Sequence, residues 1–252
     1  MEENMKKLLA VLLAGTMALS LAACGGGKTT AGTATKAAAD TTAAGTENAA
    51  AEGKEDAGTE LTGRLKAIKE AGVLKVATSP DYPPYEFEDI TKDGQDKYVG
   101  ADMELAKYIA DKLGVKLQIE AMAFDACMAA IGQGRVDLTI CGMVPKEERK
   151  TTMDFSDVYY NDGDQVIVIM KDSADQYKSL ADFAGQSIAA QNGTLQYDLV
   201  TTQIPDAKCE VVSAVTDGIM MLKTGKVAGI ALASVAADNY LANYPDLVEC
   251  SQ

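Results

Sequence analysis

The chain has 252 residues, a formal net charge of −14 at pH 7 and no histidine. The negative charge argues against nucleic acid and anionic membrane surfaces as partners, and the lack of histidine removes the commonest general base and metal ligand. Four cysteines follow Cys24 without CxxC spacing, so we expect neither a metal site nor a cofactor, while disulfide pairing and burial as free thiols both remain open. These four are Cys127, Cys141, Cys209 and Cys250.

The first predicted element is an export signal. Residues 5–24 read MKKLLAVLLAGTMALSLAAC, with two lysines, a short apolar run, small residues and a final Cys24. The apolar run over residues 8–23 is shorter than the ~20 residues that span a bilayer and is typical of a signal peptide. Residues 21–24 (LAAC) resemble the lipobox of bacterial lipoproteins, which implies cleavage before Cys24 and a lipid on its sulfur. We therefore predict a signal peptide over residues 1–23 and a protein lipid-anchored to the outer face of the cell membrane. The alternative is an ordinary signal whose cleavage happens to precede a cysteine.

A low-complexity segment follows the cysteine. No aromatic residue and no Leu, Ile, Val or Met occurs between Cys24 and Leu61. Such a segment cannot bury enough apolar surface to offset its chain entropy. We predict a flexible, lipid-anchored linker over residues 24–60.

From Leu61 onward, short apolar strands alternate with amphipathic helices. The pattern predicts strands at 73–78, 115–121 and 136–140, with helices at 101–113, ended by Gly114, and at 124–131. The second half repeats it, with strands at 187–191, 209–212, 227–232 and 247–250 and helices at 195–202, 215–222 and 233–242. A local repeat links residues 129–138 to residues 220–229, and residues 159–171 cross between the halves. Such alternation indicates parallel βαβ units, so we predict an α/β protein with lobe 1 over 61–163 and a hinge strand plus lobe 2 over 164–252, each a mostly parallel sheet flanked by helices.

Several motifs resemble a known family. They are LKVATSPDYPPYEF at 74–87, YVGADMELA at 98–106, GMVPKEER at 142–149, MDFSDVYY at 153–160 and QNGTLQ at 191–196. In this order they resemble the family 3 bacterial extracellular solute-binding proteins, the amino-acid receptors of ABC importers. The resemblance implies a two-lobe periplasmic-binding-protein fold of type II. It also implies a monomeric receptor that closes over a small polar amino acid, does no chemistry on it and delivers it to permease subunits in the membrane.

The resemblance also implies a ligand site. Arg149 would bind the ligand carboxylate, since guanidinium and carboxylate form two parallel hydrogen bonds. Backbone N–H groups near Val144 and Thr194 would complete that pocket, and Tyr82 would form an aromatic wall. The predicted ligand residues are Ser79, Tyr82, Phe124, Gly142, Val144, Arg149, Gly193 and Thr194, with Gly142 offering a carbonyl to the ligand ammonium. The competing interpretations are a surface ion pair of Arg149 with Glu147 or Glu148, a capped turn at Gly193 and Thr194, and core packing of Tyr82 and Phe124.

Three residues depart from the family's usual pattern. Val144 stands where Ser or Thr is common, Cys141 replaces a common serine, and Ala233 aligns with the acid that usually pairs with the ligand ammonium. Ser79 also stands where receptors for basic amino acids often carry Asp. Because two negative charges would be absent from the cleft, we expect a neutral polar or sulfur-containing amino acid unless Asp81 or Glu86 turns inward.

Further expectations concern the end of the chain and the rival functions. Family members continue for several tens of residues beyond the strand at 247–250, so we expect lobe 1 to lack its final segment and to expose apolar surface. One rival is a sensory or inert surface lipoprotein with the same fold. The other is a dehydratase of the cyclohexadienyl or arogenate type, which calls for a poised acid in the cleft.

Overall fold

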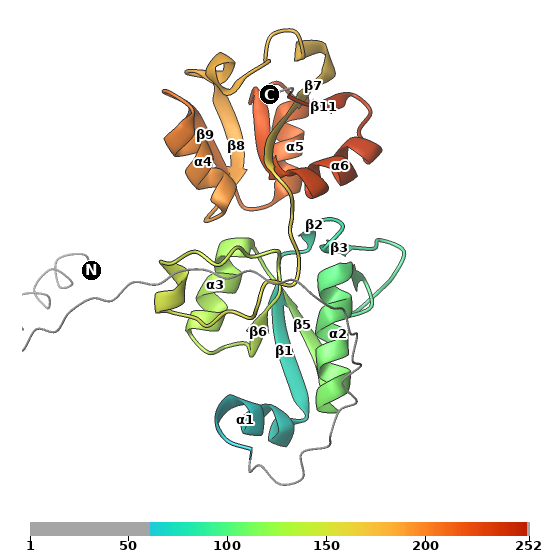
Figure 1. Ribbon diagram of the computed structural model, residues 1–252. Helices are drawn as coiled ribbons and strands as arrows, with labels where there is room; N and C mark the ends of the chain where they lie inside the picture. Colours follow the sequence, from blue (N-terminus) through green and yellow to red (C-terminus); the bar gives the residue numbers. More distant parts are fainter. Residues whose placement is uncertain (1–60, 251–252) are drawn as a thin grey trace, which may run out of the picture. The chain divides into compact units, whose positions relative to one another are not determined.

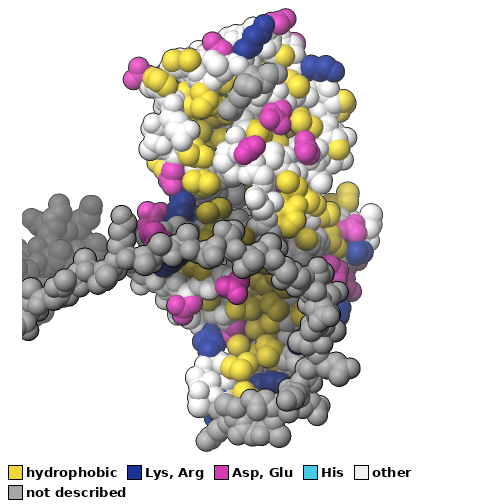
Figure 2. Space-filling view, viewed as in Figure 1, with side chains coloured by type: hydrophobic (Ala, Val, Ile, Leu, Met, Phe, Trp, Pro, Cys, Tyr) yellow, Lys and Arg dark blue, Asp and Glu magenta, His cyan; other side chains and the backbone are white. Residues whose placement is uncertain are grey.

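The computed structural model describes residues 61–250 (Figure 1). The predicted signal peptide and the whole of the predicted linker, Cys24 included, lie outside the described residues. Within the described range, no helix has the length and apolar character needed to cross a membrane. On the face shown in Figure 2, acidic, basic and hydrophobic side chains are interspersed, and the described part of that face carries no continuous basic patch.

Lobe 1, as we use the name, holds the elements that precede the crossing strand. Its helices and strands are α1 (Gly63–Ala71), β1 (Val73–Thr78), β2 (Asp81–Tyr82), β3 (Glu86–Glu88), β4 (Tyr98–Val99), α2 (Ala101–Leu113), β5 (Lys116–Ala121), α3 (Phe124–Gly132), β6 (Leu138–Thr139) and the 3-10 turn η1 (Arg149–Thr151). Strands β5, β1 and β6 form a parallel sheet in that order, and β2, β3 and β4 form a small antiparallel one.

Lobe 2 begins at the crossing strand. Its elements are β7 (Gln165–Met170), the 3-10 turns η2 (Lys171–Ser173) and η3 (Leu180–Phe183), β8 (Ser187–Gln191), α4 (Leu195–Gln203), β9 (Lys208–Val212), α5 (Val215–Lys223), β10 (Gly229–Ala233), α6 (Ser234–Asn243) and β11 (Leu247–Glu249). Its five strands run in the order β11-β7-β10-β8-β9.

The main sheets of the two lobes, β5-β1-β6 and β11-β7-β10-β8-β9, differ in strand direction. All pairings of the β5-β1-β6 sheet are parallel, as predicted. In lobe 2 the pairs β10–β8 and β8–β9 are parallel, but β7 pairs antiparallel with both β10 and β11, so this sheet is mixed rather than mostly parallel. The reason is connectivity: β8, β9 and β10 are joined through helices, whereas β7 enters directly from lobe 1 and is not held to a parallel crossover.

The main sheet of each lobe has apolar clusters on both faces. Along β7, Val166 and Val168 pack into a cluster with α5 and α6, while Ile167 and Ile169 pack into a second cluster on the other face. In lobe 1, Leu74 and Val76 of β1 pack with α1 and α2, and α3 covers a separate cluster. Strands buried on both faces read as continuous apolar runs rather than alternating ones, which matches the sequence of β7.

The predicted elements agree with the structure except at short ones. Gly114 ends α2 in the left-handed conformation, with φ 62°, as expected of a helix stop. The strand predicted at 136–140 is shortened to β6, and the sequence pattern did not identify α1 or the β2-β3-β4 sheet. Gly100 joins that small sheet to α2, and a Cβ there would lie 2.2 Å from the Tyr85 carbonyl oxygen, so only glycine allows this approach.

Candidate ligand-binding site

A pocket brings together seven of the eight predicted ligand residues. Lobe 1 contributes Ser79, Tyr82, Phe124, Gly142, Val144 and Arg149, and lobe 2 contributes Thr194. The eighth residue, Gly193, does not line the pocket, but its carbonyl accepts a hydrogen bond from Arg149 at 2.6 Å. Residues as far apart in the sequence as Ser79 and Thr194 therefore meet at one site.

Arg149 is buried at this site, with 6% of its surface exposed. Its Nη1 donates to the Val144 carbonyl and its Nη2 to the Gly193 carbonyl, each at 2.6 Å, so the guanidinium joins a lobe 1 loop to a lobe 2 turn. The guanidinium also lies 5.6 Å from the centre of the Phe124 ring, within cation–π range. Burial lowers the pKa of Arg149 from its ordinary value.

The surface ion-pair interpretation of Arg149 is wrong. In the described chain, Glu147 pairs with Lys150, and Glu148 lies 3.8 Å from the Lys146 ammonium. Phe124 fulfils both of its interpretations, because its ring lines the pocket and is also part of the buried cluster around α3.

Gly193 and Thr194 form the turn that starts α4. Gly193 has φ 74°, and Thr194 caps the helix, since its Oγ1 accepts from the Tyr197 N–H at 3.3 Å and donates to the Gln191 carbonyl at 2.8 Å. The capped-turn interpretation is therefore confirmed. Thr194 also lines the pocket, so capping does not remove it from the site.

Tyr82 reaches across the pocket to lobe 2. Its hydroxyl accepts a hydrogen bond from the Ala233 N–H at 3.1 Å. Ala233 is the position where an acid was expected to pair with the ligand ammonium, and here its backbone binds Tyr82 instead. Burial raises the pKa of Tyr82, so its hydroxyl stays neutral.

The carboxylate of Asp81 in lobe 1 forms hydrogen bonds with two residues of lobe 2. One carboxylate oxygen accepts from the Val215 N–H at 2.6 Å and from Gln191 Nε2 at 3.1 Å, and the other accepts from Ser79 Oγ at 2.8 Å. Val215 is the first residue of α5, whose own N-cap position, Ala214, offers no side chain that caps it. Asp81 of lobe 1 therefore caps a helix of lobe 2. Burial raises its pKa, and these hydrogen bonds partly offset the rise.

Two more acids line the pocket from lobe 1. Glu86 is 1% exposed, and its Oε2 accepts no hydrogen bond from the described residues. Burial, and then the charge of the neighbouring Asp102, hold the pKa of Glu86 well above its ordinary value. Asp162 accepts from the Tyr85 hydroxyl at 2.6 Å, and burial raises its pKa.

The exception that the neutral-ligand prediction allowed therefore applies, because Asp81 and Glu86 line the pocket. Three carboxyl groups, those of Asp81, Glu86 and Asp162, line the same pocket as Arg149. The motif around residues 81–86 contained two of them, but sequence alone gave no inward orientation. No sequence motif indicated that Asp162 belongs to the site, because it lies in the irregular segment that crosses between the lobes.

The remaining predicted residues have structural roles in the same loop. The Gly142 N–H donates to Asp102 Oδ2 at 3.0 Å, and the Val144 carbonyl accepts a hydrogen bond from Arg149.

Cys141 is a buried thiol that lines the pocket, 3.4 Å from Thr139 Oγ1. Cys127, Cys141 and Cys209 are free thiols, and the Cys250 thiol donates to the Tyr177 carbonyl. Within residues 61–250, no group of three or more Cys, Asp or Glu side chains is placed to hold a metal ion.

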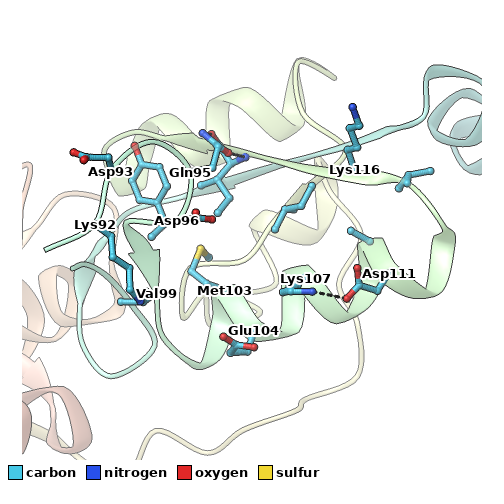
Figure 3. A pocket seen from close by; sticks show the side chains of 15 residues that line it. Lys92, Asp93, Gln95, Asp96, Val99, Met103, Glu104, Lys107, Asp111 and Lys116 are labelled. Atoms are coloured by element: carbon cyan, nitrogen blue, oxygen red, sulfur yellow. Dashed lines mark hydrogen bonds and ion pairs between the residues drawn. The ribbon is translucent and has the colours of Figure 1, made fainter. Parts of the chain in front are cut away.

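A second hollow lies on lobe 1, between β4, α2 and β5 (Figure 3). It is lined by both lysines and acids, among them Lys92, Asp96, Lys107 and Asp111, and Lys107 pairs with Asp111. None of the predicted ligand residues lines it. Because both positive and negative side chains line it, this hollow favours neither an anionic nor a cationic ligand. We therefore place the candidate site in the pocket of Arg149.

Comparison with known proteins gives consistent matches. The model of the family "Bacterial extracellular solute-binding proteins, family 3" matches residues 74–235. The chain is 34% identical over 197 residues to the arginine-binding extracellular protein ArtP of Bacillus subtilis, covering 77% of this chain and 71% of that protein. It is 32% identical over 175 residues to the L-cystine-binding protein TcyA of the same organism, covering 69% and 62%. The arginine-bound form of truncated ArgBP from T. maritima superposes with a TM-score of 0.69 at 37% identity, covering 74% of this chain and 85% of that one.

Proposed function

This chain belongs to family 3 of the bacterial extracellular solute-binding proteins, and we propose that it binds a basic amino acid, arginine or lysine, in the pocket of Arg149. Membership of this family places its work outside the cytoplasm. The observation that carries the proposal is the set of ionisable groups in the pocket, where one buried guanidinium is accompanied by three carboxyl groups. Similarity to a protein named as arginine-binding and to an arginine-bound structure supports the same ligand class.

Each end of such a ligand has a matching partner. The ligand carboxylate would bind to Arg149. The guanidinium would give up one of its hydrogen bonds to a carbonyl and form a stronger, charge-assisted hydrogen bond with the ligand. The turn at Gly193 and Thr194 would face the same carboxylate from lobe 2, and Tyr82 and Phe124 would enclose the ligand's carbon chain. Its two cationic groups would lie toward Asp81, Glu86 and Asp162, which together offset the missing acid at Ala233.

We further propose that the protein is a receptor rather than an enzyme. It would close lobes 1 and 2 about the crossing strand β7, with boundaries near residues 163 and 164, and deliver the ligand to the permease subunits of an ABC importer. Cys24 would anchor it to the membrane through lipid. Replacement Cys24→Ala should move the protein from the membrane fraction to the soluble fraction, and unchanged membrane retention would contradict the anchor.

The ligand proposal is tested by a binding screen. The purified protein is titrated calorimetrically with each of the twenty amino acids and with cystine. We expect arginine or lysine to bind most tightly, and Arg149→Ala to weaken that binding at least ~10-fold, since a hydrogen bond to a charged group contributes roughly 1.5–3 kcal/mol. Lys150→Ala is the matched control, because Lys150 pairs with Glu147 on the surface and does not line the pocket. Tight binding of a neutral amino acid only, or wild-type affinity in Arg149→Ala, would overturn the assignment.

A further inference from the structure

Glu86 is buried in the pocket without a complete set of partners. Only 1% of its surface is exposed, and its Oε2 accepts no hydrogen bond from any described residue. A charged carboxylate in this position costs free energy, since the oxygen is shielded from solvent and no described donor compensates it. The group therefore needs either a proton of its own or a cation from outside.

The groups that face Glu86 supply no cation. They are Asp81 and Tyr82 on β2, Asp102 on α2, Cys141 after β6 and Tyr159 of the crossing segment. The two oxygens of Asp102 accept from the Gly142 N–H at 3.0 Å and the Tyr159 hydroxyl at 2.9 Å, and the Asp102 side chain also shares a hydrogen bond with Glu86, which requires a proton on one of the two carboxyl groups. Arg149 lines the same pocket, but its guanidinium donates to two carbonyls. An acid surrounded by acids retains its proton more strongly.

The other two pocket acids have partners. Asp81 accepts from the Val215 N–H, Gln191 and Ser79, and Asp162 accepts from the Tyr85 hydroxyl. Among the described acids that line the pocket, Glu86 alone has a buried oxygen without a donor. It is therefore the pocket acid with most to gain from an incoming ammonium or guanidinium group.

We propose that Glu86 carries a proton in the ligand-free protein and releases it to solvent when the cationic group of the ligand enters the pocket. The carboxyl O–H bond breaks, its electron pair stays on the carboxylate oxygen, and the proton leaves to the buffer, so an ion pair replaces a neutral acid. The raised pKa of Glu86, caused first by burial and then by Asp102, agrees with this exchange. This inference rests on the proposed binding of a basic amino acid and adds that binding is linked to pH through one named residue.

The test is calorimetric titration of the protein with L-arginine, or with the amino acid that the screen selects, in two buffers of different ionisation enthalpy. We expect the measured enthalpy to depend on the buffer and to report release of about one proton per ligand below the titration of Glu86. Over that range the affinity should rise about tenfold per pH unit. An enthalpy that is the same in both buffers at every pH would overturn the proposal.

Three variants assign the proton. Glu86→Gln, which keeps the shape of the side chain, should abolish proton release and flatten the pH dependence of affinity. Asp81→Asn and Asp162→Asn remove proposed ligand contacts and should weaken binding, but should retain the release of about one proton per bound ligand. If Glu86→Gln does not fold, loss of release in an aspartate variant that still binds would overturn the assignment, and retention in the variants that bind supports it. Binding without proton release defeats this inference alone, whereas failure of every amino acid to bind defeats the proposed function as well.

Discussion

In lobe 2 the strand order β9-β8-β10 continues into β7 and β11, whereas the corresponding order β5-β1-β6 of lobe 1 ends at β6 among the described residues. The interiors differ as well. The buried charged residues of the described chain, Glu86, Asp102 and Arg149, all belong to lobe 1, and the buried polar residues of lobe 2 are the uncharged Gln191 and Thr194.

This difference shows how the two lobes divide their work. Burying charge costs stability unless every charge is well paired, and a short sheet offers little apolar burial to offset that cost. Lobe 2 has an apolar core on both faces of a five-stranded sheet, so we expect it to be the more stable lobe. Lobe 1 carries the buried charged residues, so we expect it to be the less stable one.

The largest expected effect comes from matched core truncations. Leu74 of β1 and Ile188 of β8 are the second residues of equivalent strands, and each is at most 1% exposed. Leu74→Ala and Ile188→Ala should each lower the free energy of unfolding by roughly 2–5 kcal/mol through lost burial and the cavity left behind. Amide hydrogen exchange should accelerate mainly in the lobe that carries the change, and more in lobe 1. Equal acceleration in both lobes would show that they unfold as one unit and would break the comparison.

A pH-dependent effect is expected at Glu86. Its pKa is raised in the folded protein, so its stabilising contribution is fully present below the ordinary value of 4.5 and is lost as pH rises through the folded-state pKa. Glu86→Gln removes this dependence, so its stability relative to the wild type should increase by about 1.4 kcal/mol per pH unit within that window. Denaturant unfolding of the ligand-free proteins over a pH series measures this. A constant difference at every pH would show that Glu86 is already ionised and compensated.

The smallest expected effect tests the contact between the lobes. Asp81→Ala removes the cap that lobe 1 provides to α5, which should cost about 0.5–2 kcal/mol and speed exchange of the Val215 amide. Asp81→Asn is the matched control, since it keeps an oxygen that can accept the same hydrogen bond. Unchanged exchange at Val215 in Asp81→Ala would mean that the lobes are held together by other contacts.

Much of the fold is local in origin and was predictable. Helix α2 follows from apolar residues at helical spacing and the stop at Gly114, and β8 follows from a short apolar run. The direction of β7 was not predictable, because the sequence of a strand does not determine which neighbouring strand it pairs with. Short elements such as β2 and β3 were also not predictable from the sequence, since two or three residues are too few to show a periodic pattern.

The sequence by itself determined the family, the alternation of strands and helices, and the identity of Arg149 and most of the residues around it, because these are recorded in contiguous motifs. Only the tertiary structure decided the charge of the pocket. Asp81 lies on β2, Glu86 on β3, Arg149 in η1 and Asp162 in the segment before β7, and whether each carboxyl faces the pocket or solvent depends on how these elements pack. Burial and neighbouring charge, which set the protonation of Glu86, are properties of that packing and of no single stretch of sequence.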